Sequence, residues 1–356
     1  MDYIAVVLRR RFTREIPHTP PRRTARPRGA LRFPGAGAGW RAQRSAHELS
    51  GALCLMILTR RIFSARSPDL TRALLIGGEG PPVLLLHGYP QCHATWHDVA
   101  PTLAKRYTVI APDLPGYGKS RVLDAGPWHK RAVGTELVAM MRALGHDRFA
   151  VIGHDRGARV GYRLALDHPD RVSAYCSLAV VPTLDVWPAV DRQFAKGAFH
   201  WFLFAQPGDL PERMLAADPD AFLDATLNHM AGGIENLHPA AVAAYREAFR
   251  ETSVRHAMIE DYRSAYDVDA DHDAADRASG HKITCPVMVL WADERLVASG
   301  METGALTASD VWRRWADDVR GFDIASGHLL PEQAAEAVIE KVIPFLDASL
   351  QSDANN

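Results

Sequence analysis

The segment whose residues most clearly indicate catalysis is Gly153-His-Asp-Arg-Gly157, which follows an apolar run in the middle of the chain. Glycines on both sides of a central polar residue permit a sharp turn from a strand into a helix, and this turn lifts the central side chain out of the sheet. The central residue is Asp155. A carboxylate at a helix N-terminus is stabilised by the helix dipole, so Asp155 is predicted to be ionised and nucleophilic. The alternative is a simple helix cap, which does not require the flanking glycines.

Two other segments supply the partners that a nucleophile needs. The apolar run Val83–Leu86 leads into His87-Gly-Tyr-Pro90, where the backbone N–H of Tyr89, together with that of Arg156, is predicted to form an oxyanion hole. His328 lies on a loop before the last helical stretch. One histidine among 16 indicates little by itself, but the chain order of nucleophile, helical insertion and terminal histidine predicts that His328 is the general base.

The elements that must position these residues follow an alternating pattern. Past residue 80, short apolar runs alternate with longer amphipathic stretches, which is typical of parallel strands joined by helices. The predicted strands are Val83–Leu86, Tyr107–Ala111, Phe149–Ile152, Ala174–Ala179, Val287–Trp291 and Gly321–Ala325, and the predicted helices cover 97–105, 130–144, 157–168 and 332–349. The fold class is therefore α/β, with a mostly parallel sheet flanked by helices. The alternation stops between Thr183 and Gly280, where we expect an inserted helical cap.

The N-terminal segment differs from the rest of the chain. Residues 1–55 hold 11 arginines, no lysine and three acidic residues, without a sustained hydrophobic period. We interpret them as a disordered leader or a misassigned start, with translation beginning at Met56; a nucleic-acid-binding arm and a transit-like presequence are the alternatives. The predicted domains are a core over 56–182 and 281–350, a cap over 183–280, and a disordered tail over 351–356.

The composition restricts the class of protein. The 356 residues are 47% hydrophobic and 23% charged, with a net charge of −1, which fits a globular enzyme and excludes collagen, coiled coil and bulk disorder. A net charge near zero favours neither nucleic acid nor an anionic membrane as a partner. The apolar run from Leu53 to Leu58 is far shorter than a membrane span. The four cysteines form no C-x-x-C pair, so we expect free thiols and a cytoplasmic location.

Several motifs together show a family resemblance. From about Leu75 to Leu346 the chain resembles an α/β-hydrolase, and within that superfamily it is similar to the haloacetate (fluoroacetate) dehalogenases. The resemblance is carried by His87-Gly-Tyr-Pro-Gln91, Gly153-His-Asp-Arg-Gly-Ala-Arg159, Asp167-His-Pro-Asp170, His200-Trp201, Asp261-Tyr-Arg263 and Gly327-His328. The first of these motifs is shared with epoxide hydrolases and haloalkane dehalogenases, whereas the second is more specific.

Two arginines near the nucleophile indicate the charge of the substrate. In epoxide hydrolases and haloalkane dehalogenases the residue after the nucleophile is typically Trp, but here it is Arg156, with Arg159 one helical turn beyond Asp155. A substrate carboxylate ~4 Å from Asp155 would be repelled by about 4 kcal/mol at an effective dielectric constant of about 20. A guanidinium grip on that carboxylate would offset the repulsion and orient the substrate. The alternative is that the arginines form structural ion pairs.

The resemblance implies a two-step mechanism. Asp155 attacks the α-carbon and expels halide, and His328 then activates water to hydrolyse the resulting ester. His200, Trp201 and Tyr262 match the halide-binding positions of the family, and each offers an N–H or O–H donor. Trp201 and Tyr262 could instead be aromatic residues that pack the cap onto the core.

The chain departs from the family at one position. The acid that orients the histidine usually follows the sixth strand, and Ala179 occupies that place here. Other α/β-hydrolases carry the acid after the seventh strand, where this chain has Asp293 and Glu294. We select Asp293 as the orienting acid. The alternatives are Glu294, or that both are solvated loop charges.

The resulting hypothesis is a hydrolase that needs neither metal nor cofactor and removes halide from a small 2-haloacid. Its predicted partner is this small anionic substrate, without nucleic acid or membrane; the oligomeric state, a homodimer among the options, is left open. A second hypothesis is an epoxide hydrolase, which needs two cap tyrosines from among Tyr245, Tyr262 and Tyr266. A third is a binding protein that keeps Asp155 and the arginines but does not complete the reaction because it lacks an acid at position 179.

Overall fold

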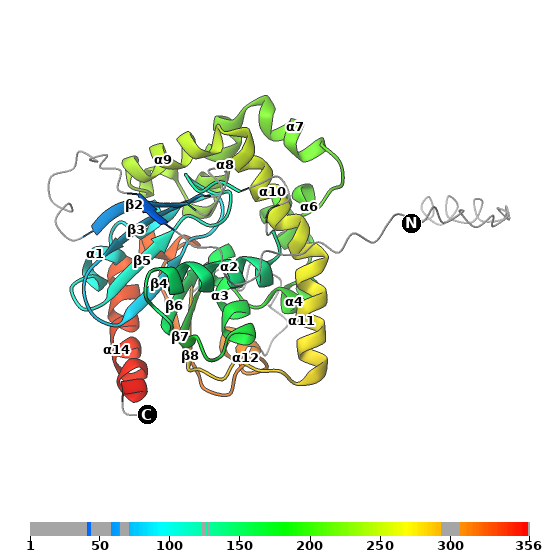
Figure 1. Cartoon of the computed structure of the whole chain (residues 1–356). Coiled ribbons are helices and arrows are strands. Elements are labelled where there is room, and N and C mark those ends of the chain that lie inside the picture. The colour runs from blue at the N-terminus through cyan, green and yellow to red at the C-terminus, as the bar shows by residue number, and fades with distance from the viewer. Residues whose placement is uncertain are drawn as a thin grey trace, which may run out of the picture. The chain divides into compact units, whose positions relative to one another are not determined.

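The computed structural model describes residues 41–43, 58–64, 71–122, 126, 128–292 and 307–354. They form a nine-stranded sheet with the order β1-β2-β3-β5-β4-β6-β7-β8-β9 (Figure 1). The strands are β1 (Arg41–Gln43), β2 (Leu58–Ser64), β3 (Thr71–Gly77), β4 (Pro82–Leu86), β5 (Thr108–Pro112), β6 (Phe149–His154), β7 (Val172–Leu178), β8 (Val287–Ala292) and β9 (Val319–Ile324).

The parallel part of the sheet, β4 to β9, contains all six predicted strands. These strands are short apolar runs because helices cover both faces of the sheet. The antiparallel strands β1, β2 and β3 were not predicted. In β2 the apolar residues are interrupted by charged ones, as in Thr59-Arg60-Arg61, so this edge of the sheet lacks the continuous apolar signal of a central strand.

The helices outside the insertion agree with the predicted pattern. They are α1 (Val99–Leu103), α2 (Lys130–Ala143), α3 (Arg156–Asp167), α12 (Ala308–Trp312), α13 (Leu330–Gln333) and α14 (Ala335–Ala354), with the short 3-10 turn η1 (His93–Trp96). One apolar core contains residues of α2 and α3, and a second contains residues of α1 and α14. The sheet therefore lies between two layers of helices. Helix α14 continues four residues into the predicted tail, since Gln351 to Ala354 include neither glycine nor proline to end it.

The segment between β7 and β8 is helical wherever the structure assigns regular elements. It contains α4 (Thr183–Val186), α5 (Arg192–Gly197), α6 (Phe199–Phe204), α7 (Leu210–Ala217), α8 (Pro219–Ala231), α9 (Pro239–Phe249), α10 (Thr252–Tyr266) and α11 (Val268–Ser279), with the turns η2 (Trp187–Ala189) and η3 (Ile234–Asn236). Helices α7 to α10 lie at one end of the sheet, at the top of Figure 1. Helix α11 contacts the core directly, through Arg163 of α3 and Asp276.

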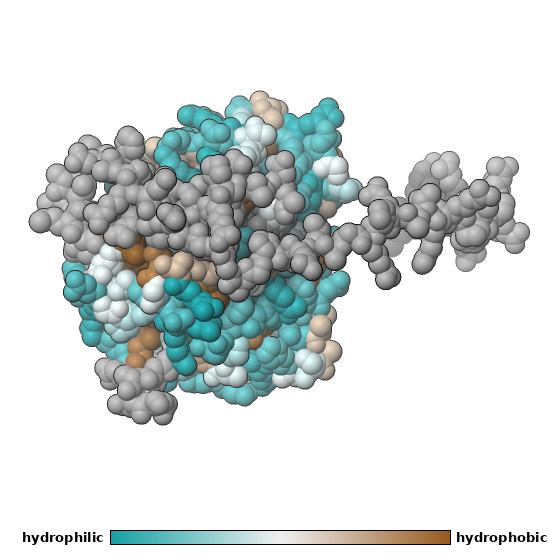
Figure 2. Space-filling model, viewed as in Figure 1, coloured by the Kyte–Doolittle hydropathy of each residue, from teal (hydrophilic) through white to brown (hydrophobic). Residues whose placement is uncertain are grey.

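Three residues of the predicted leader, Arg41–Gln43, form β1 and pair with β2; the other residues of 1–55 lie outside the described part of the chain. The face of the molecule in Figure 2 is mainly hydrophilic, with apolar residues in small patches. No helix among the described residues is long and apolar enough to cross a membrane. Cys92, Cys176 and Cys285 are buried.

The turn between β6 and α3 depends on close backbone packing. Asp155 adopts φ 48° and ψ −115°, a conformation that L-residues rarely adopt and that costs about 1–3 kcal/mol. A Cβ atom on Gly157 would collide with the carbonyl oxygens of Leu86 and His87 at the end of β4. Glycine at 157 therefore lets the first turn of α3 lie directly against the neighbouring loop.

We expect Gly157→Ala to lower the free energy of unfolding by about 2 kcal/mol, since the added methyl group meets backbone atoms rather than a flexible side chain. Gly197→Ala in α5 is the matched control, because the nearest atom to its new Cβ is Nε2 of His229 at 3.4 Å. Alanine there should leave stability unchanged or raise it slightly. Urea unfolding curves of the two variants give the comparison, and equal losses would contradict the packing argument.

Candidate functional site

Three loops at the carboxyl ends of the parallel strands β4, β6 and β9 meet at Asp155. The backbone N–H of Tyr89, after β4, donates to Oδ1 of Asp155 at 3.0 Å. Nε2 of His328, after β9, lies 3.5 Å from Oδ2 of the same carboxylate. The carboxyl ends of parallel strands are the usual place for such a convergence. The structure thus brings together three groups that the sequence placed more than 60 residues apart.

The environment of Asp155 keeps its carboxyl group ionised. Burial alone would raise its pKa, but the hydrogen bond and the charge of His328 hold the pKa of Asp155 well below its ordinary value. His154 and Arg156 act in the same direction. Since Asp155 is only 4% exposed, little water competes for its oxygens. The group is therefore a buried, anionic carboxylate, which is the form that a nucleophile needs.

The loop of His328 is held from two sides. Nε2 of His154 lies 2.8 Å from the carbonyl oxygen of His328, and the His328 N–H donates to the carbonyl of Met230 at the end of α8, at 3.3 Å. Burial lowers the pKa of His154 to about 4, so His154 is neutral at pH 7 and can donate one ring N–H. The position of His328 therefore depends on both the sheet and the insertion.

The acid expected behind His328 is not among the described contacts. Asp293 and Glu294 lie outside the described residues. Within the part of the chain that is described, Asp155 is the only carboxylate with an ion pair to the His328 ring. Ala179, at the place of the family's usual acid, has a φ of 68° and lines the cavity beside Asp155.

Arg156 is directed at Asp261 of α10. Its Nε donates to Oδ2 of Asp261 at 2.7 Å, and its Nη2 donates to the Asp261 carbonyl at 2.8 Å. The guanidinium carbon lies 4.2 Å from the ring centre of Tyr262. Lys130 of α2 also contacts the Asp261 carboxylate. For Arg156 the structure therefore shows a structural ion pair, which the sequence analysis gave as the alternative to substrate binding. Nη1 of Arg156 has no hydrogen-bond partner among the described residues.

Arg159 lies on the wall of the cavity. Its Nη1 donates to the carbonyl of Val181 at 3.1 Å and to Oγ1 of Thr183 at 2.8 Å. No salt bridge between described residues involves Arg159, and its buried Nε has no hydrogen-bond partner among them. The Arg159 guanidinium is therefore a cation at the cavity that pairs with no carboxylate of the described residues.

The cavity has a volume of about 200 Å³. It is lined by Asp155, Arg159, Ala179, Val180, Val181, Val186, Phe194, Gly197, Ala198, His200, Trp201, His229, Met230, Trp291, Ala292 and His328. The lining thus combines one carboxylate and one guanidinium with mostly apolar walls. This combination suits a small molecule with one anionic end.

The predicted halide-binding residues lie in one aromatic cluster. The His200 ring stacks on Tyr89 at 5.1 Å, and Tyr262 meets both rings edge to face. Burial lowers the pKa of His200 to about 3, so its imidazole is neutral and offers one N–H. The buried hydroxyl of Tyr262 has no hydrogen-bond partner among the described residues. His200 and Trp201 line the cavity, while Tyr262 lies next to His200.

Groups of metal-ligating side chains occur elsewhere in the described chain. Three sets have ligand atoms within 4.8 Å of one another, namely Cys92, His93 and Asp113; His129, Asp269 and His272; and Glu212, His256 and Glu260. In the buried first set, Asp113 already accepts hydrogen bonds from the backbone N–H groups of His93 at 2.7 Å and Lys119 at 2.8 Å. None of the three sets includes Asp155 or His328. The expectation of a reaction without a metal stays a prediction.

Sequence reasoning missed the groups that hold the arginines. Asp261 belongs to the motif Asp261-Tyr-Arg263, but it was not predicted to bind an arginine. Thr183 was expected only to begin the insertion. One signal was present: Asp269, Asp273 and Asp276 recur at spacings of four and three residues, which places them on one helix face. An acidic face on a helix of the insertion could have been matched with the basic face of α3.

Comparisons with known proteins agree with the observed fold. A family profile described as alpha/beta hydrolase fold matches residues 81–302. A fluoroacetate dehalogenase of Burkholderia sp is 36% identical over 283 residues, covering 78% of this chain and 91% of that protein. A soluble epoxide hydrolase of Corynebacterium sp. (strain C12) is 28% identical over 277 residues, covering 75% of this chain and 91% of that protein.

A solved structure of a provisionally named epoxide hydrolase from Pseudomonas aeruginosa is also similar. It is 49% identical, with a TM-score of 0.79, and the match covers 83% of this chain and 98% of that one. Another variant of the same protein was solved with bound MFA.

We expect Asp261→Asn to lower the free energy of unfolding by about 3–5 kcal/mol at pH 7, because it leaves the buried cation Arg156 without its carboxylate and Lys130 with Asp269 alone. Since Arg156 and Lys130 hold the pKa of Asp261 at about 2 despite its burial, its contribution is present above the ordinary value of 3.8 and is lost as the pH falls toward 2. The difference between variant and wild type should therefore shrink over that range.

Urea unfolding at several pH values measures this difference. The control is Asp220→Asn, which removes an exposed ion pair with Arg250 and should have no measurable effect at any pH. A difference between Asp261→Asn and wild type that is independent of pH would contradict the assignment.

Proposed function

Because this chain belongs to the alpha/beta hydrolase fold family, we propose that it hydrolyses the carbon–halogen bond of a small 2-haloacid. The relatives named above support a hydrolase of this fold. The observation that carries the finer proposal is that an ionised Asp155 and the unneutralised cation Arg159 lie on the wall of one small cavity. A neutral substrate would leave that buried guanidinium uncompensated, whereas a carboxylate would pair with it.

In the first step, the Asp155 carboxylate attacks the α-carbon. An ester bond forms as the carbon–halogen bond breaks, and the halide leaves with the bonding electron pair. Arg159 holds the substrate carboxylate away from Asp155 and orients the carbon for in-line attack. The neutral imidazole of His200, the indole of Trp201 and the free hydroxyl of Tyr262 provide donors for the halide.

In the second step, His328 takes a proton from water, and the resulting hydroxide attacks the ester carbonyl of Asp155. The ester C–O bond breaks, the oxygen of the leaving 2-hydroxyacid takes one of the two water protons, His328 releases the other to solvent, and the Asp155 carboxylate is restored. Negative charge develops on the Asp155 oxygen during this step, and the Tyr89 N–H already donates to one of its oxygens at 3.0 Å. The role of orienting His328 falls to Asp293 or Glu294.

The contacts of the cap tyrosines argue against an epoxide hydrolase. That reaction needs two tyrosine hydroxyls beside the nucleophile. The Tyr245 hydroxyl donates to Glu332 at 2.8 Å, and Tyr266 is 55% exposed. Of the three tyrosines considered, only Tyr262 presents a buried hydroxyl without a partner in the described structure.

Halide release from fluoroacetate and chloroacetate tests the proposal. We expect release by the purified full chain and none by freshly prepared Asp155→Asn, since an amide is a very weak nucleophile. Chloroacetamide is the matched neutral substrate and should react far more slowly, because it lacks the charge that pairs with Arg159. Equal rates with chloroacetamide, or normal release by Asp155→Asn, would contradict the proposal. A stable ester mass on wild-type protein would favour an enzyme that stalls after the first step, whereas unmodified protein without halide release would favour the binding protein.

In a chain that carries Asp293→Asn and Glu294→Gln, we expect Ala179→Asp to raise the rate of ester hydrolysis at least about tenfold, because it restores an acid at the place from which relatives orient the histidine. Asparagine tolerates the positive φ of this residue about as well as aspartate does, so Ala179→Asn is the matched control and should give no gain. Stopped-flow decay of the ester measures both. An equal gain in both variants would show that relieved backbone strain, and not a carboxylate, is responsible.

A further inference from the structure

The contacts that fix Arg159 are unusual for a buried cation. The residue is 3% exposed, yet its hydrogen-bond partners are a carbonyl and a hydroxyl rather than a carboxylate. Long side chains lose much rotamer freedom when they are fixed. What holds the Thr183 hydroxyl in place therefore affects where the guanidinium lies.

A chain of hydroxyl groups leads from Arg159 to a buried acid. The hydroxyl oxygens of Thr183 and Tyr162 lie 3.2 Å apart. The Tyr162 hydroxyl donates to Oδ2 of Asp273 at 2.7 Å. Asp273 is 1% exposed. The carboxylate is thus connected to Arg159 through two hydroxyl groups, one from α3 and one from the start of the insertion.

The charge of Asp273 sets the direction of these hydrogen bonds. An ionised carboxylate only accepts, so the single proton of Tyr162 is directed to Asp273. The Thr183 hydroxyl then donates to the Tyr162 oxygen, and its lone pairs face the N–H of Arg159. Burial raises the pKa of Asp273 to about 6, which leaves it ionised at pH 8.

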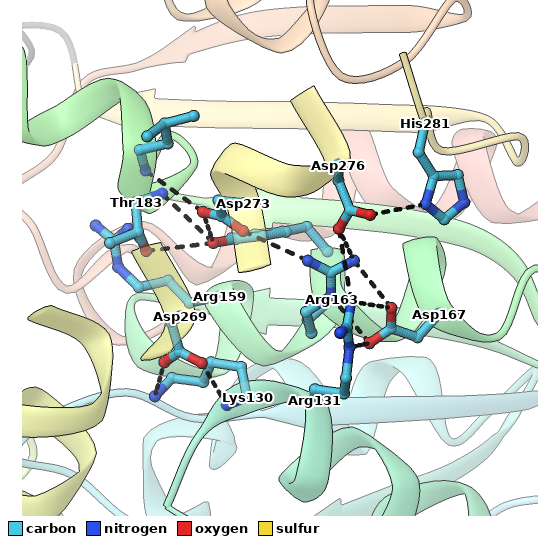
Figure 3. Close-up of polar contacts among 12 residues, drawn as sticks. Lys130, Arg131, Arg159, Arg163, Asp167, Thr183, Asp269, Asp273, Asp276 and His281 are labelled. Carbon is cyan, nitrogen blue, oxygen red and sulfur yellow. Dashed lines mark hydrogen bonds and ion pairs between the residues drawn. The ribbon is translucent and has the colours of Figure 1, made fainter. Parts of the chain in front are cut away.

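A network of charges fixes Asp273 in turn. Arg163 lies 3.5 Å from Oδ1 of Asp273 and also pairs with Asp167 at 2.9 Å. The backbone N–H of Leu184 donates to Oδ2 of Asp273 at 3.4 Å. Figure 3 shows Asp273 between Thr183 and Arg163, with Arg159 beside Thr183. The acid is therefore held by α3 and α4 at once.

We propose that Tyr162 and Asp273 are positioning residues, which act through Thr183 to aim the Arg159 guanidinium at the carboxylate of the substrate. This inference rests on the proposed function for the identity of the substrate. We call the hydrogen-bonded series of Asp273, Tyr162 and Thr183 the relay. Arg159 contacts the substrate, and the relay orients the Thr183 hydroxyl so that its lone pairs face the Arg159 guanidinium.

Binding of chloroacetate to the freshly prepared Asp155→Asn chain tests the relay without turnover. Calorimetric titration at pH 8 gives the Kd. Tyr162→Phe in this background should raise the Kd about five- to tenfold, the effect of one lost hydrogen bond. Thr183→Val should do the same. Because one relay is broken in either case, the double variant should be no weaker than either single variant.

Tyr107→Phe is the matched control. The Tyr107 hydroxyl also donates to a carboxylate, that of Asp347 at 2.6 Å, but it belongs to the apolar core on the other side of the sheet. Its removal should leave the Kd unchanged. In the chain with Asp155 intact, Tyr162→Phe should raise the KM for chloroacetate by the same factor and change kcat less than twofold.

Independent, additive effects of the two substitutions would overturn the relay. So would an unchanged Kd in folded Tyr162→Phe or Thr183→Val, or the absence of chloroacetate binding. If Tyr162→Phe does not fold, Thr183→Val decides, because it removes the hydroxyl that touches Arg159. Loss of binding in the variants without halide release by wild type would support the relay and reject the proposed reaction.

Discussion

A buried carboxylate that must stay ionised is the constraint on which this site depends. Asp155 is held in a rare backbone conformation, almost out of contact with water, where an isolated acid would take up a proton. The fold prevents this by bringing a backbone N–H from one loop and an imidazole from another against its two oxygens. Because these loops follow β4 and β9, two parallel strands of one sheet, the register of the sheet determines the geometry of the site.

The insertion contributes acidic side chains as well as apolar residues that line the cavity. Its helices α10 and α11 carry Asp261, Asp269, Asp273 and Asp276 to the basic surface formed by α2 and α3. Asp261 pairs with Arg156 and Lys130, so these two cations are neutralised within the protein. Among the described residues, Arg159 donates to a hydroxyl and a carbonyl and lies over the Trp201 ring, but it pairs with no carboxylate. The distribution of acids on the insertion thus decides which arginine stays available at the cavity.

The sequence was sufficient for the parts of the molecule that follow local patterns. The parallel strands are continuous apolar runs, and the turn at Asp155 has glycines where the backbone of α3 approaches β4. Charged residues interrupt β2, so it gives no continuous apolar run, whereas β3 contains Ala73-Leu-Leu-Ile76 and was missed although this signal was present. Asp155 was predicted from its glycine-flanked turn, and His328 from its order along the chain.

The different roles of Arg156 and Arg159 could not be predicted from local patterns or from order along the chain. Arg156 and Arg159 differ by three positions on one helix, and their types give no preference between an ion pair and a ligand. The difference arises from Asp261, about a hundred residues away, and from the packing of α10 over α3. Such long-range pairing depends on tertiary packing and on no local signal.

The contacts of Asp261 also restrict how the cavity can exchange its contents with solvent. This one residue of α10 accepts hydrogen bonds from Arg156 on α3 and from Tyr117 on the loop after β5, and it pairs with Lys130 on α2. Lifting α10 away would expose three donors from three parts of the core at once. Passage of substrate and product should therefore occur where α5 and α6 border the cavity with Phe194, Ala198 and Trp201, by rearrangement of apolar side chains rather than by opening of the whole insertion.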